Sequence, residues 1–148
     1  MMCEKYLDCK KALKSAIVLY ALIFTFVSAL MFYVPQAAYN AVSVVMAAVL
    51  IFIVAKHYFR AYKPANPVAS GLALGVTFAV VMFVLDVALM VYGFASQLGW
   101  SYFASYSQMV GYALTIVLPV LAAKMVWGKK AAPARARARR SRSRRSRR

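Results

Sequence analysis

The sequence predicts an all-α polytopic membrane protein, with four transmembrane helices in an antiparallel bundle and both termini in the cytoplasm. Hydrophobic residues make up 64% of the 148 positions, and they gather in four blocks of about 20 residues, the length that crosses a bilayer. Lysine and arginine lie almost entirely outside these blocks and give a net charge of +16. Such a composition excludes a soluble globular domain.

The chain opens with a basic lead-in, residues 1–14, which we expect at the cytoplasmic membrane surface. The first span covers about 15–34 and ends at Pro35, because proline cannot continue the hydrogen bonding of a helix. A short uncharged turn follows, and Asn40 is the expected N-cap of the second span, 40–58. Two helices joined so tightly must be antiparallel neighbours.

A basic link with two prolines separates the second span from the third. The third span covers about 70–94 and contains a carboxylate, Asp86. An uncharged turn leads to the fourth span, 103–127, where Pro119 predicts a kink. Together, residues 15–127 form the predicted transmembrane domain.

The C-terminal segment 128–148 consists mainly of alanine, arginine and serine. It cannot bury a core, so we expect a disordered cytoplasmic tail. Its arginines favour binding to anionic lipid headgroups, with nucleic acid as the alternative partner through phosphate contacts. The candidate contact residues are Arg135, Arg137, Arg139, Arg140, Arg142, Arg144, Arg145, Arg147 and Arg148.

Orientation follows from the positions of lysine and arginine in the short connecting segments. The lead-in 1–14 is basic, the link after the second span is basic, and the other two turns carry no charge. Basic loops remain on the cytoplasmic side. Both termini and the middle link are therefore predicted to be cytoplasmic, in the cell membrane.

Asp86 is the candidate functional residue, because an ionisable group inside a span costs about 2.5–3.5 kcal/mol and usually faces the bundle interior. No basic residue lies at its predicted depth, so burial favours its protonated form. Two interpretations stay open: a structural hydrogen-bonding centre, or a proton, cation or partner site. The polar residues expected within reach are Thr25, Ser28, Asn40, Ser43, Gln108, Tyr112 and Thr115.

Small residues mark two helix faces. On the third span Gly71, Gly75 and Ala79 are spaced four apart, and on the fourth span Gly111 and Pro119 share a comparable face with Thr115 and Ala122. Small residues let membrane helices approach closely. We expect these faces to pack within one chain, and homo-oligomerisation through them is the alternative.

Signals of catalysis or of metal or cofactor binding are lacking in the sequence. There are no paired carboxylates, no Ser-His-Asp set and no phosphate-binding loop, so we expect no enzyme activity and no cofactor. Cys3 and Cys9 lack further ligand residues nearby and are expected to be free thiols in a reducing compartment. His57 is expected to be an interfacial side chain.

The third and fourth spans, with Gly71-x3-Gly75, Asp86 and Pro119, resemble small four-helix prokaryotic integral membrane proteins of unknown function. The resemblance covers about half the chain and implies no catalytic residue. We therefore predict a non-enzymatic accessory or scaffold protein whose partners are membrane lipids, a second copy or another membrane protein. The alternatives are a small proton- or cation-coupled transporter using Asp86, and a membrane tether for nucleic acid.

Overall fold

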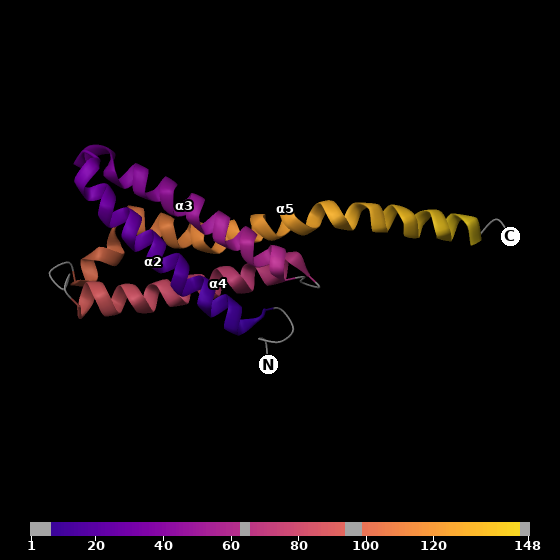
Figure 1. Ribbon diagram of the computed structural model, residues 1–148, viewed down its shortest axis with the longest axis horizontal. Coiled ribbons are helices and arrows are strands. Elements are labelled where there is room, and N and C mark those ends of the chain that lie inside the picture. The colour runs from indigo at the N-terminus through magenta and orange to yellow at the C-terminus, as the bar shows by residue number, and fades with distance from the viewer. Residues whose placement is uncertain (1–6, 63–65, 94–98, 146–148) are drawn as a thin grey trace.

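The computed structural model describes residues 7–62, 66–93 and 99–145, and this part of the chain contains helices but no strand. Four long helices form a bundle, from which the C-terminal part of the last helix extends (Figure 1). The elements in chain order are α2 (Cys9–Tyr33), α3 (Gln36–Ala61), α4 (Pro67–Asp86), the π-helix η1 (Val87–Val91), the 3-10 helix η2 (Gly99–Ala104) and α5 (Tyr106–Arg145).

Four stretches are long and apolar enough to cross a membrane: Cys9–Tyr33, Ala38–Ala61, Pro67–Val91 and Tyr106–Trp127. The surface of the bundle is apolar as well, with Phe32 86% and Tyr33 85% exposed. Large exposed apolar surfaces are unfavourable in water and ordinary in contact with lipid. The expectation of four membrane-spanning helices is confirmed to this extent.

Side-chain caps explain where two of the helices begin. Asp8 caps α2, since its Oδ1 accepts from the Lys11 amide at 3.3 Å, and the Lys11 ammonium lies 3.0 Å from its Oδ2. The α2 helix therefore starts at Cys9, within the predicted lead-in. Asn66 caps α4 by accepting from the amides of Val68 and Ala69, and proline follows it at the first helical position.

Two expectations near these helix starts are wrong. Asn40 does not cap α3, which begins at Gln36 directly after Pro35 and has no side-chain cap. The helix starts early because Pro35 has a φ of −58°, which suits helix entry, and alanines follow. Cys9 is disulfide-bonded rather than a free thiol, and Cys3 lies outside the described residues.

The α4 and α5 helices pack closely because glycine lines their contact. A Cβ built on Gly71 would lie 2.6 Å from Val120 Cα, and one on Gly75 would lie 2.7 Å from the Ile116 carbonyl oxygen. No Cβ atom fits at such distances, so α5 of the same chain occupies this glycine face. Pro119 is buried at the contact, and α5 continues across it.

The core lies where the four helices meet, and alanine is common in it because the helix axes lie close together. Ser70 is also buried there, and its hydroxyl oxygen has no hydrogen-bond partner among the described residues. The buried apolar residues are Leu7, Ala12, Ala16, Leu19, Ile51, Ala55, Tyr58, Phe59, Leu74, Phe78, Met82, Ala122 and Ala123.

Hydrogen bonds join the helices near their ends. The Asp8 amide donates to the Tyr58 hydroxyl at 3.0 Å, which links the start of α2 to the end of α3. The Trp127 indole donates to the Phe59 carbonyl at 2.9 Å and links α5 to the same region of α3. At the other end of α3, the Tyr39 hydroxyl donates to a carbonyl of α2.

The segment from residue 128 was expected to be disordered, whereas the structure continues α5 to Arg145. Alanine and arginine are both strong helix formers, and the segment prolongs a helix that already exists, so no new nucleus is needed. The extension projects away from the bundle (Figure 1). Arg147 and Arg148 lie outside the described residues.

Candidate functional site

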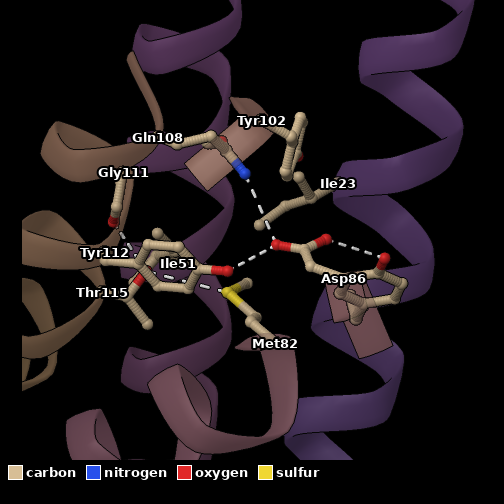
Figure 2. Close-up of a pocket in the computed structure, with 11 residues that line it drawn as sticks. Ile23, Ile51, Met82, Asp86, Tyr102, Gln108, Gly111, Tyr112 and Thr115 are labelled. Atoms are coloured by element: carbon tan, nitrogen blue, oxygen red, sulfur yellow. Dashed lines mark hydrogen bonds between the residues drawn. The ribbon is translucent and has the colours of Figure 1, made fainter. Parts of the chain in front are cut away.

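Asp86 is buried at the C-terminal end of α4, and its carboxylate is the centre of a polar network (Figure 2). The Tyr112 hydroxyl donates to Oδ2 at 2.6 Å, and the Gln108 amide approaches the same oxygen at 3.4 Å. The Tyr20 hydroxyl donates to Oδ1 at 2.9 Å. Both carboxylate oxygens therefore have donors, and the network connects α2, α4 and α5.

The network can be completed in either protonation state of Asp86. An ionised carboxylate only accepts, and three donors surround it, with the short Tyr112 bond in the range of charge-assisted bonds. A protonated carboxyl needs one acceptor, and a tyrosine hydroxyl can supply it by reversing its role. No ion pair to Asp86 is present within the described residues, where the one ion pair joins Asp8 and Lys11.

A cavity of about 90 Å³ lies beside the Asp86 carboxylate. It has room for a few water molecules and has polar groups that could bind them. Its walls are mostly apolar, so water inside would concentrate on the carboxylate and its donors. The lining residues are Tyr20, Ile23, Ala47, Ile51, Met82, Asp86, Tyr102, Gln108, Gly111, Tyr112 and Thr115.

Gly111 was expected to pack helices together, but it borders this cavity. A Cβ built on Gly111 meets nothing within 4 Å, in contrast to Gly71 and Gly75. Its missing side chain leaves space next to Asp86. The Thr115 hydroxyl lies 2.8 Å from the Gly111 carbonyl and 3.7 Å from the Met82 sulfur, so it lines the cavity without bonding to Asp86.

The remaining residues expected around Asp86 lie elsewhere. The Thr25 hydroxyl donates to the carbonyl of Ala21 on its own helix at 2.8 Å, and Ser43 donates in the same way to Tyr39 at 2.7 Å. Asn40 is exposed and Ser28 is half-buried, and neither lines the cavity. These four hydroxyl and amide groups were expected near Asp86 because the antiparallel spans were projected to the same depth.

Two tyrosines of the site were missed by that projection. Tyr20 precedes Thr25, the nearest expected partner on α2, by about one and a half helical turns, yet its hydroxyl donates to the carboxylate. Figure 1 shows why, since α2 crosses α4 obliquely. Tyr102 lines the cavity from η2.

The backbone changes its winding immediately after Asp86. Val87–Val91 forms a π-helix, with the Tyr92 amide bonded to the Val87 carbonyl at 3.3 Å. The third span was expected to be one regular helix, and its expected end at residue 94 lies outside the described residues. π-Helical turns occur frequently at functional sites, so this one marks the neighbourhood of Asp86 for testing.

Aromatic rings cover the same end of the bundle. The ring centroid of Phe103 lies 5.2 Å from that of Phe83, 5.4 Å from that of Tyr102 and 5.8 Å from that of Trp100. Phe83 also contacts the Tyr112 ring at 6.4 Å. The contact between Phe83 and Phe103 holds η2 against α4 beside the cavity, and Phe83 in turn contacts α5 through Tyr112.

Metal binding has no support in the described part of the chain, where no group of three His, Cys, Asp or Glu side chains could hold an ion. Comparison of the chain with protein-family models, curated proteins and solved structures found no match. The fold alone therefore assigns the class. Four apolar helices of membrane-spanning length define a small multi-pass membrane protein.

Proposed function

We propose that the chain is a non-enzymatic accessory or scaffold protein of the cytoplasmic membrane. One observation carries the proposal: both Asp86 oxygens are hydrogen-bonded to side chains of the same bundle. The Asp86 carboxyl, whose insertion into a membrane is unfavourable, thereby holds α2, α4 and α5 together. In this role Asp86 determines the packing of the bundle, and the apolar outer surface and the basic α5 extension provide the contacts with lipid or partners.

Substitution of Asp86 tests this role. Asp86→Asn keeps a donor and an acceptor at similar volume, so the free energy of unfolding should change by no more than about 1–2 kcal/mol. Asp86→Leu leaves three half-buried polar groups, those of Tyr20, Gln108 and Tyr112, without their partner and should cost about 2 kcal/mol. Both variants are compared in detergent micelles by unfolding and by co-purification of bound partners.

The proposed arrangement is an antiparallel bundle with both termini in the cytoplasm. Its support is the basic character of the lead-in and of the link after α3. The disulfide at Cys9 favours the opposite orientation, because disulfides persist in oxidising compartments. A cysteine at Tyr33 or Trp100, both exposed, should react with an impermeant thiol reagent from outside in a cysteine-free background, and a cysteine at Arg60 should not.

The α5 extension is proposed to bind anionic lipid at the cytoplasmic surface. Each arginine near such a surface contributes about 1 kcal/mol, and salt screens the attraction. A peptide of residues 131–148 should bind vesicles of phosphatidylglycerol and lose affinity steeply as salt rises. Tighter binding to RNA than to these vesicles at physiological salt would favour the tether for nucleic acid instead.

A small transporter is the second candidate, and the cavity beside Asp86 is the observation that favours it. A carboxyl that meets water in a cavity could exchange a proton during a transport cycle. Asp86→Asn cannot titrate, so a pH-driven flux in proteoliposomes would disappear while the protein stays folded. Wild-type proteoliposomes without any flux, or an Asn variant that keeps it, would favour the scaffold.

A further inference from the structure

A second cavity, of about 470 Å³, lies between α2 and α3 at the end of the bundle where α2 begins and α3 ends. It is separate from the Asp86 cavity and shares no residue with it. The hydrogen bond from the Asp8 amide to the Tyr58 hydroxyl holds the two helices in register there. The lining residues are Lys11, Lys14, Ser15, Val18, Ile53, Val54, His57, Tyr58 and Ala61.

This second cavity is a groove between α2 and α3, and its lining changes from cationic to apolar along the helix axes. On α2 the lining runs from Lys11 to Val18, about 10 Å at 1.5 Å per residue. On α3 it runs in the opposite sense, from His57 to Ile53. The charged end therefore lies at the helix termini, where a membrane meets water, and the apolar end lies deeper.

Within the described residues, no carboxylate neutralises all of the positive charge at the cationic end. Lys11 is paired with Asp8 at 3.0 Å. Lys14 is exposed and has no carboxylate partner within the described ranges. Asp8 there pairs with Lys11, and Asp86 is bonded within its own network. An anionic group at this end would therefore meet the ammonium of Lys14, the ammonium of Lys11, which it would share with Asp8, and the imidazole of His57.

We propose that this groove binds one anionic phospholipid molecule. Its phosphate lies at Lys14 and Lys11, and one acyl chain follows Val18 and Ile53 toward the interior. A phospholipid fits because it is charged at one end and apolar at the other, along the same direction as the groove. Basic pockets between helices at the membrane surface recognise such headgroups. The proposal rests on the membrane-spanning fold and does not involve the arginines of α5.

Native mass spectrometry of the full chain tests the headgroup end. The protein is purified in mild detergent and supplied with equal amounts of phosphatidylglycerol and phosphatidylcholine. Lys11→Gln combined with Lys14→Gln should lower retention of phosphatidylglycerol roughly 25-fold, taking about fivefold for each lysine. The matched control combines Lys10→Gln with Lys124→Gln, which removes the same charge at exposed positions outside the groove and should retain one phosphatidylglycerol per chain.

The apolar end is tested by filling it. Ile53→Trp should displace the acyl chain and release the lipid, whereas Val49→Trp, at an exposed position of α3 outside the groove, should not. Inorganic phosphate at 10-fold excess over lipid should fail to compete, because it lacks the chain. Equal retention of phosphatidylcholine, equal loss in the lysine control, or displacement by inorganic phosphate would each overturn the proposal.

The two lipid proposals fail independently. Binding by the α5 arginines is measured on a peptide and vesicles, and its failure leaves the groove lipid in place. Loss of the groove lipid in wild-type protein, with the peptide still bound to vesicles, would overturn the groove alone.

Discussion

Replacing the glycines of α4 by alanine should separate α4 from α5. The Cβ of Gly71→Ala would lie 2.6 Å from Val120 Cα and 3.0 Å from the Pro119 carbonyl oxygen. The Cβ of Gly75→Ala would lie 2.7 Å from the Ile116 carbonyl oxygen and 2.9 Å from its Cα. All four atoms belong to the α5 backbone, so no rotamer change can make room and the helices must move apart.

The size of the effect follows from two opposing terms. Overpacking of a filled interior costs about 1–3 kcal/mol, while exchanging glycine for alanine within a helix returns up to about 1 kcal/mol. Each substitution should therefore lower the free energy of unfolding by about 1–2 kcal/mol. Gly111→Ala is the matched control, because its Cβ meets nothing within 4 Å, and it should be neutral or stabilising by up to about 1 kcal/mol.

Reversible unfolding in mixed detergent micelles, followed by the loss of helical circular dichroism, measures these differences. Gly71→Ala and Gly75→Ala should unfold at lower denaturant than wild type, and Gly111→Ala at the same or higher denaturant. If all three variants unfold together, the close contact between α4 and α5 does not exist in the folded protein. The identity of the helix that fills the glycine face would then be open again.

Three further predictions concern single contacts. Tyr112→Phe removes the shortest bond to Asp86 and should cost about 0.6–1.7 kcal/mol in micellar unfolding; no change would mean that Tyr112 does not hold the carboxylate. Hydrogen bonds from Lys11 lower the pKa of Asp8 below its ordinary value of 3.8. The ionised Asp8 cap therefore stabilises α2 above pH 3.8, and this stabilisation is lost as the pH falls through the lowered pKa. NMR chemical shifts of the first turn of α2 should report the loss, and Asp8→Asn, which still caps the helix, should abolish the pH dependence. Trp127→Phe removes the indole donor to α3 and should cost about 1 kcal/mol, and exchange of the α3 amides should show whether that end opens.

Much of the fold followed from residue patterning. Four apolar blocks of membrane length predicted four helices. The third span was expected from about residue 70, whereas α4 begins at Pro67 and is capped by Asn66. The helix ends were less accurate. The start of α2 depends on the side chain of Asp8, which accepts a hydrogen bond from the Lys11 amide. Composition indicated disorder from residue 128, whereas alanine and arginine extend an existing helix there.

The polar centre was predictable only in part. Gln108 and Tyr112 were identified because α5 follows α4 in the chain and runs beside Asp86. Tyr20 was missed because crossing angles between helices depend on how side chains interdigitate, and one sequence does not reveal them. The same limit applies to Gly111, whose spacing resembles a packing motif although the structure leaves open space at its Cα.

The contacts of α5 explain why its basic extension matters to the rest of the bundle. This helix supplies the backbone against which Gly71 and Gly75 pack, two of the three donors to Asp86, and the indole that bonds to α3. It then continues without interruption to Arg145. A membrane surface or a partner that binds the extension therefore binds the helix on which the packing of α4 and the network of Asp86 both depend. Any displacement along α5 must change the glycine contact and the carboxylate network together, because both lie on one continuous helix.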